Sequence, residues 1–317
     1  MLPAKGPWPH PYYDIPDAFV DVSFVDEEGT TRHIGVRHKT LGDGPPMVLV
    51  HGLMNSSYSW RYVLDRLAKK YRVLAPDLVG SGSTDKPSDL VYSVANVARF
   101  IRAYVRTVSK EPVYLIGNSL GGLYCVRALL DDGEGDQRIA RRFVLGHAPG
   151  YPMVRARLMN ALQSAPLFGH GLMSAVAGIS HRWPRVFVAK NVHYHRKDML
   201  CEEETIEHGR PFETMEGARV FMRIMRESVN AREHAGVIAE LRRRKAAGVP
   251  FPCPTRILYA REDVMVPPAF GPMFHEDIPG SELVWMDDTS HFLHVDAPER
   301  TVEQIFSFDD LAGLRAA

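Results

Sequence analysis

The sequence predicts an α/β protein with a mostly parallel, doubly wound, eight-stranded sheet and an inserted helical cap. Short apolar runs alternate with helix-length segments along most of the chain, which is typical of βαβ units. One interval, residues 150–229, breaks this alternation and carries only helical patterns cut by Pro and Gly. We therefore expect a core domain made of residues 1–149 and 230–317, with residues 150–229 forming the cap.

Eight strands are expected. The first two, 19–25 and 33–39, are separated by Glu28 and Gly29 and are interpreted as an antiparallel hairpin at the sheet edge. The other six runs are short and apolar, as suits strands covered on both faces. They are 47–50, 72–75, 113–116, 143–145, 256–259 and 283–286. Helices are expected at 57–69, 93–108, 120–130 and 298–308.

The cap is rich in methionine. Seven of the 13 methionines fall within residues 150–229, at positions 153, 159, 173, 199, 215, 222 and 225. Methionine is unbranched and polarizable, so a cap of this composition would suit an adaptable apolar pocket. The alternative is that most of these side chains only pack cap helices together, as the helical stripe of Val220, Phe221 and Ile224 suggests.

The composition excludes several function classes. Lys+Arg and Asp+Glu number 38 each, so no overall positive charge recruits nucleic acid or an anionic membrane. Cys125, Cys201 and Cys253 are scattered and form no CxxC motif, which favours a reducing compartment. The N-terminus lacks the apolar segment of a signal peptide, and no run of about 18 apolar residues is present. We expect a cytoplasmic protein without a membrane span, either monomer or homodimer.

The segment Gly117-Asn118-Ser119-Leu120-Gly121-Gly122 is the most informative. It is a G-x-S-x-G turn between an apolar strand and a helical segment. Glycines are needed there because the turn is too sharp for side chains, and the turn leaves the serine hydroxyl exposed near a helix N-terminus. Ser119 is therefore the expected nucleophile.

A serine hydroxyl needs a general base that is itself held in place. Asp263 lies in the loop after the strand 256–259, and His291 in the loop after the strand 283–286. Ligands and catalytic groups collect at such strand ends in open α/β sheets. We expect His291 to accept the Ser119 proton through Nε2 and to donate a hydrogen bond from Nδ1 to Asp263.

Nearby groups offer alternatives to these assignments. Glu262 is adjacent to Asp263, but its side chain should point the other way. Asp287 and Asp288 are expected to form a turn, and His294 to lie in the helix after the loop. Some relatives of this fold place the acid after the strand that precedes the cap, but residues 146–149 contain no carboxylate, which favours Asp263.

An oxyanion hole requires two donors. The expected donors are the backbone N–H groups of Leu120 and Leu53, the latter after the tight turn at Gly52. His51 is expected to hold this loop by hydrogen bonds. The expected substrate pocket is lined by Met54, Asn118, Met265 and Phe292.

No metal or cofactor is expected. His193 and His195 are two residues apart and would not share a helix face, although His181 and His208 are nearby in the sequence. No HExxH motif or Cys/His pair is present.

With these residues in place, the chain resembles α/β-hydrolase-fold enzymes over about residues 35–149 and 230–310. The segments HGLMNSSYSW, RVLAPDLVGSGSTDKP, GNSLGG and SHFLHVDAPE occur in the family order. The first two are similar to haloalkane dehalogenases and epoxide hydrolases, which attack with an aspartate where this chain has Ser119. This resemblance therefore implies the scaffold and not those reactions. GNS also occurs in hydrolases of carbon–carbon bonds, whose HGxGPG loop differs from HGLMNS here.

These residues predict a serine hydrolase, first of all a carboxylesterase for small to medium apolar esters that works through an acyl-enzyme. The alternatives are hydrolysis of a carbon–carbon bond in a ring-fission product, of a thioester or lactone, or perhydrolysis. A ligand receptor that keeps the fold without turnover is a third class. The intact set of Ser119, Asp263 and His291 argues against it.

Overall fold

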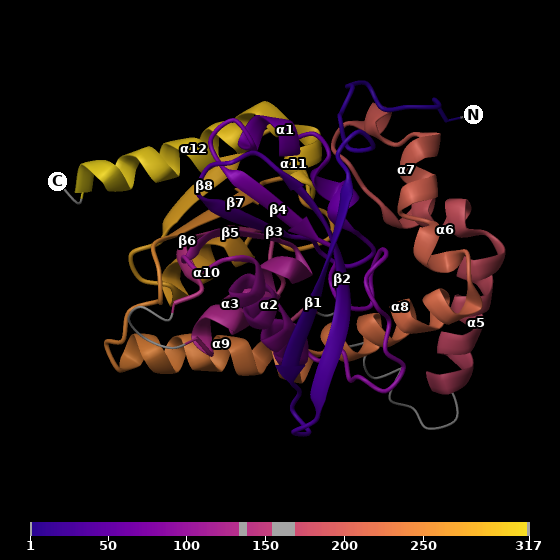
Figure 1. Cartoon of the computed structure of the whole chain (residues 1–317), viewed down its shortest axis with the longest axis horizontal. Helices are drawn as coiled ribbons and strands as arrows, with labels where there is room; N and C mark the ends of the chain where they lie inside the picture. Colours follow the sequence, from indigo (N-terminus) through magenta and orange to yellow (C-terminus); the bar gives the residue numbers. More distant parts are fainter. Residues whose placement is uncertain (1, 133–137, 154–168, 316–317) are drawn as a thin grey trace.

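The computed structural model describes residues 2–132, 138–153 and 169–315, and it contains one eight-stranded sheet (Figure 1). The strands are β1 (Asp17–Val25), β2 (Thr31–Leu41), β3 (Pro46–Val50), β4 (Arg72–Pro76), β5 (Val113–Asn118), β6 (Ala140–Gly146), β7 (Thr255–Ala260) and β8 (Glu282–Met286). Their spatial order is β1-β2-β4-β3-β5-β6-β7-β8. The first two form the expected antiparallel hairpin, β2 pairs antiparallel with β4, and the other pairs are parallel. The predicted fold class is confirmed.

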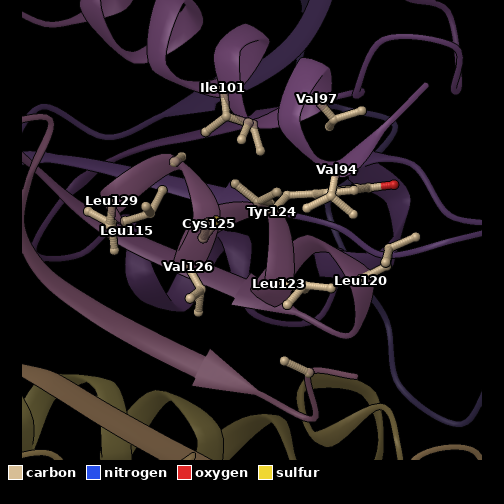
Figure 2. Packing of buried hydrophobic residues seen from close by; sticks show 14 of the residues in the cluster. Val94, Val97, Ile101, Leu115, Leu120, Leu123, Tyr124, Cys125, Val126 and Leu129 are labelled. Carbon is tan, nitrogen blue, oxygen red and sulfur yellow. The ribbon is translucent and has the colours of Figure 1, made fainter. Parts of the chain in front are cut away.

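Both faces of the sheet are covered, which explains why the parallel strands are apolar throughout. In β3, Val48 and Val50 join one buried cluster, whereas Met47 and Leu49 join the cluster on the opposite face. Helices α2 (Val94–Val108), α3 (Leu120–Leu130), α9 (Ala231–Ala246) and α10 (Phe270–Asp277) lie on the first face; α1 (Leu64–Leu67), α11 (Leu293–Asp296) and α12 (Pro298–Arg315) lie on the second (Figure 1). Figure 2 shows side chains of α2, α3 and β5 packed together in the first cluster.

The prediction of a helix at 57–69 was wrong. The chain forms a 3₁₀ turn, Ser57–Trp60, and then the single turn of α1. Residues 57–64 are all buried, and contacts with another segment hold the start of this stretch, where the Ser57 N–H donates to Asp77 Oδ1 at 2.8 Å. The backbone breaks at Val63, whose φ of −118° departs from helical values.

Among the described residues between β6 and α9, four α-helices are present: α5 (Gly169–Arg182), α6 (Pro184–Asn191), α7 (Glu202–Glu207) and α8 (Met215–Ser228). They stand together beside one edge of the core (Figure 1). Five of the cap methionines belong to or pack against one apolar cluster, called here the cap cluster, which also includes the core residues Tyr62, Phe292 and Val295; these methionines are at positions 173, 199, 215, 222 and 225. This placement favours the packing interpretation for these side chains. Met159 lies outside the described residues, and the exact cap boundaries stay a prediction.

The N-terminal arm runs over the cap of the same chain. The N–H groups of Glu202 and Glu203, at the start of α7, donate hydrogen bonds of 2.8 Å and 3.2 Å to the carbonyls of Pro3 and Ala4. His10 Nε2 lies 2.8 Å from a carboxylate oxygen of Glu203. The arm therefore closes one side of the junction between cap and core.

The three cysteines are buried and free. In the part of the chain that the structure describes, no helix combines the length and apolar character needed to cross a membrane.

Candidate active site

Ser119 occupies a strained turn between β5 and α3. Its φ is 58°, in the left-handed region that residues other than glycine rarely adopt. The Ser119 N–H donates a 2.8 Å hydrogen bond to Gly146 O, and the Gly122 N–H donates one of 2.9 Å to Ser119 O. Backbone strain of this kind persists only where surrounding contacts hold it, and it is common at functional sites.

The glycine at position 121 lets α3 approach the end of β3. A Cβ atom at Gly121 would lie 2.3 Å from the backbone oxygen of His51 and 2.6 Å from that of Val50. Neither oxygen can move without disturbing the sheet. The sequence motif therefore reflects a close backbone contact as well as the turn itself.

The loop after β3 lies directly against Ser119. A Cβ atom at Gly52 would be 2.7 Å from Ser119 Cβ and 3.2 Å from Ser119 Oγ. The backbone N–H groups of the next residue, Leu53, and of the first residue of α3, Leu120, donate no hydrogen bond to another described residue. The structure thus brings together the two loops that carry the expected oxyanion donors.

His51 holds this loop. The N–H of Leu78 donates to His51 Nε2 at 3.0 Å, so the ring proton is on Nδ1, which donates to Gly52 O at 2.8 Å. Burial lowers the pKa of His51, which keeps the ring neutral, and the Leu78 N–H selects this tautomer. The structural role expected for His51 agrees with these contacts.

Asp263 and His291 lie at the carboxyl ends of β7 and β8. His291 Nδ1 is 2.8 Å from Asp263 Oδ2, and both side chains are buried. Asp263 Oδ1 accepts hydrogen bonds from the N–H groups of Met265 (2.7 Å) and Val266 (2.9 Å). Among the hydrogen bonds of the described residues, none joins Ser119 Oγ to the His291 ring. Catalytic hydrogen bonds are often longer before substrate binds.

Electrostatics keeps Asp263 ionised. Burial pushes the pKa of this carboxyl upward, but the neighbouring imidazoles of His291 and His147 outweigh burial and hold the pKa well below its usual range. An ionised Asp263 can orient the Nδ1 proton of His291 and leave Nε2 free to accept a proton.

The alternative residues lie elsewhere. Glu262 pairs with His195 at 2.7 Å and its side chain is 55% exposed. Asp287 is exposed beside Arg261, and Asp288 has a φ of 52° in the turn. His294 lies within α11 and stacks on Trp60, with ring centroids 4.2 Å apart.

A third buried group, His147, was not assigned a role from the sequence. It follows β6 directly, and its Nδ1 lies 2.8 Å from Asp263 Oδ2, with both side chains 0% exposed. The contact lacks the geometry of an aligned hydrogen bond. Its place in the sequence could have pointed to His147, because residue 147 occupies the strand end where some relatives of this fold carry the acid.

The ligand atoms of His147, Asp263 and His291 lie within 4.8 Å of one another, a set that could hold a metal ion. The hydrogen bonds favour a different use. The N–H of Ala260 donates to His147 Nε2 at 3.2 Å, so Nδ1 carries the proton and faces the carboxylate. A metal ion would have to displace that proton and the one between His291 and Asp263.

The residues expected to line the substrate pocket lie in different environments. Asn118 is buried, and its Nδ2 donates to the carbonyl of His291 at 3.3 Å. Met265 is 40% exposed, and its contribution to the site is the N–H that binds Asp263. Phe292 is buried in the cap cluster, with its ring perpendicular to that of His291 and the centroids 5.2 Å apart.

Met54 lines a small cavity beside the loop after β3. The cavity has a volume of about 20 Å³, room for about one water molecule. Its walls include residues of the loop after β3, the loop after β4, helix α3 and the cap helix α8, among them Leu53, Leu78, Val79, Tyr124, Phe221 and Ile224. Phe221 and Ile224 belong to the helical stripe that suggested packing within the cap.

A family model described as the alpha/beta hydrolase fold matches residues 45–298. An uncharacterized hydrolase of Bacillus subtilis, YugF, is 26% identical over 264 residues, covering 83% of this chain and 89% of that protein. A pimeloyl-[acyl-carrier protein] methyl ester esterase of Aeromonas hydrophila is 26% identical over 288 residues, which cover 87% of this chain and 99% of that protein. The structure of the meta-cleavage product hydrolase CumD of Pseudomonas fluorescens covers 95% of this chain and 99% of its own, with a TM-score of 0.68 and 21% identity, a likeness of fold. The chain is a hydrolase of the α/β-hydrolase fold family.

Proposed function

We propose that the protein is a serine carboxylesterase that acts on small to medium apolar esters through an acyl-enzyme. The observation that carries this proposal is the convergence of four strand-end loops. A strained Ser119 follows β5, the 2.8 Å pair of Asp263 and His291 follows β7 and β8, and the loop at Gly52 lies against the serine.

In the acylation step, Ser119 Oγ attacks the ester carbonyl while His291 Nε2 takes the hydroxyl proton. The N–H groups of Leu53 and Leu120 stabilise the negative charge that develops on the carbonyl oxygen. When the tetrahedral intermediate collapses, His291 gives its proton to the departing alcohol. Asp263 stabilises the transient imidazolium and holds its orientation.

In the deacylation step, water attacks the acyl-enzyme with His291 again as general base. The same two N–H groups bind the second oxyanion, and the carboxylic acid leaves as Ser119 regains its proton. None of these steps requires a metal ion or an organic cofactor.

The substrate class follows from the apolar walls near the serine. The cavity holds about one water molecule, so an acyl group would enter as Phe221 and Ile224 of α8 move away from Leu53. Apolar walls favour an alkyl or aryl substituent over a charged one. The ester bond cleaved by the Aeromonas esterase is the same functional group, which supports this choice among hydrolase reactions.

The test is steady-state hydrolysis of p-nitrophenyl esters from acetate to laurate by wild type, Ser119→Ala and Ser88→Ala. Ser88 is an exposed serine and serves as the matched control. We expect a chain-length optimum in wild type and in Ser88→Ala, and a loss of at least about 1,000-fold in Ser119→Ala. Turnover that survives in Ser119→Ala would refute the assignment of the nucleophile.

Labelling of Ser119 by a fluorophosphonate separates the remaining possibilities. Labelling without turnover of any ester in the series would refute the esterase proposal while leaving an active serine. Carbon–carbon, thioester and lactone substrates would then be compared. A single turnover without repetition would indicate a ligand receptor.

A further inference from the structure

We propose that His147 is a positioning residue of the catalytic triad, which holds the Asp263 carboxylate from the side opposite the backbone loop so that it orients His291. The inference rests on the proposed serine-hydrolase function and names a fourth side chain for that site. It starts from three observations on His147, concerning its contact, its tautomer and its backbone.

The first observation is the contact. Asp263 Oδ2 lies 2.8 Å from Nδ1 of His291 and 2.8 Å from Nδ1 of His147, while Oδ1 accepts two backbone N–H groups. A carboxylate with neighbours on both oxygens cannot rotate about its last bond without losing some of them. His147 therefore restricts the same oxygen that His291 uses.

The second observation is the tautomer. The N–H of Ala260 fixes Nε2 of His147 as an acceptor, so Nδ1 carries the proton and lies 2.8 Å from Asp263 Oδ2 in a close polar contact. Burial lowers the pKa of His147, so the ring is neutral and places a polar N–H beside the carboxylate without adding a positive charge. The ionisable groups that influence this ring are Asp263, His291 and, at α11, Asp296.

The third observation is the backbone. His147 has a φ of 43°, in the left-handed region where a residue other than glycine is uncommon. Its N–H donates to Leu258 O at 3.3 Å, and the preceding carbonyl, of Gly146, accepts the N–H of Ser119. The strained residue thus lies between the nucleophile turn and the strand that carries the acid, where strain is commonly associated with function.

Two substitutions separate the contact with Asp263 from the rest of the ring. In His147→Asn, the amide nitrogen can occupy the position of Nδ1, and asparagine tolerates a positive φ. In His147→Gln, the amide reaches the position of Nε2 and can still accept the Ala260 N–H, but no donor remains beside Asp263. His147→Gly removes the side chain and relieves the backbone strain, which guards against misfolding of the Gln variant. His38→Leu is the matched control, because His38 is a buried histidine of β2 whose ring meets that of Tyr104 in α2 edge to face.

The measurement is the second-order rate of Ser119 labelling by a fluorophosphonate, on full-length variants whose thermal unfolding is also recorded. We expect His147→Gln and His147→Gly to react about 10- to 100-fold more slowly, because a misplaced Asp263 misorients His291. His147→Asn should restore the rate to within about threefold of wild type, because its amide nitrogen replaces Nδ1, and His38→Leu should also react within about threefold of wild type.

Equal rates in wild type, His147→Gln and His147→Gly would show that the contact does not position Asp263. Equal losses in the Asn, Gln and Gly variants would show a purely structural role of the ring. A wild-type protein that labels but hydrolyses no ester would refute only the esterase proposal, whereas one that does not label would refute both.

Discussion

A buried ion pair joins the core to the cap, and its removal should destabilise the protein strongly. Arg61 follows the 3₁₀ turn of the core, and it donates to Glu204 of α7, with both side chains 0% exposed. The guanidinium lies between the rings of Tyr58 and Tyr62, at 4.4 Å and 4.2 Å from their centroids. The second oxygen of Glu204 accepts from Tyr194 Oη at 2.6 Å and lies 3.0 Å from His208 Nε2.

The pKa of Glu204 gives the magnitude of the stabilisation that its ionised carboxylate contributes to the fold. Burial pushes this pKa upward, but the charge of Arg61 and the neighbouring His208 and Tyr194 outweigh it and lower the pKa from 4.5 to about 2. A difference of about 2.5 pH units corresponds to about 3 kcal/mol of stabilisation. Because the folded-state pKa is the lower one, this stabilisation is complete above pH 4.5 and is lost as the pH falls through about 2.

The perturbation is Glu204→Gln, which leaves Arg61 buried without an anion. We expect the free energy of unfolding at pH 7, from urea denaturation, to fall by about 3–5 kcal/mol. The difference from wild type should be about 2 kcal/mol smaller at pH 3 than at pH 7, because the unfolded wild-type chain takes up a proton in this range. Arg61→Met combined with Glu204→Met should recover most of the loss.

The matched control is Asp198→Asn. Asp198 also forms an ion pair in the cap, with Arg196 at 2.6 Å, but the two side chains are 38% (Arg196) and 53% (Asp198) exposed. Its loss should cost less than about 1 kcal/mol, because water screens exposed pairs. A Glu204→Gln variant that loses no more than this control, or a loss that does not change between pH 7 and pH 3, would refute the reasoning.

Three further predictions concern the site. Asp263→Asn should lower kcat for ester hydrolysis by about 10³- to 10⁴-fold with little change in thermal unfolding, because an amide can hold the wrong tautomer of His291. A loss of kcat below tenfold would contradict the role of Asp263. Gly121→Ala should reduce both stability and activity, measured by urea unfolding and ester turnover, because the new methyl group would lie 2.3 Å from the His51 carbonyl; wild-type stability would contradict the geometry. Ile224→Ala should shift the ester chain-length optimum towards longer acyl groups, and an unchanged optimum would place the acyl site elsewhere.

The sequence by itself determined the sheet and the chain order of the candidate triad. Apolar runs of strand length, separated by helical segments, can form a stable structure only by covering both sheet faces, so β3 to β8 could be placed within a few residues. The turn at Ser119 could also be predicted from the sequence, because its glycines are required by contacts within a few residues and with the adjacent strand. The position of Asp263 and His291 after successive strands followed from the rule that functional groups gather at strand ends.

Only the tertiary structure decided how side chains from distant segments meet. His147 and Asp263 are 116 positions apart, and Arg61 and Glu204 are 143 apart, so no local pattern relates either pair. The tautomers of His51 and His147 depend on backbone N–H groups of neighbouring strands and loops. The segment 57–69 looked helical because the periodicity of apolar residues is read within one segment. Its actual conformation also depends on contacts with other segments, such as the hydrogen bond from the Ser57 N–H to Asp77. Local periodicity reports one face of one element, and the contacts that complete this site come from several elements packed around it.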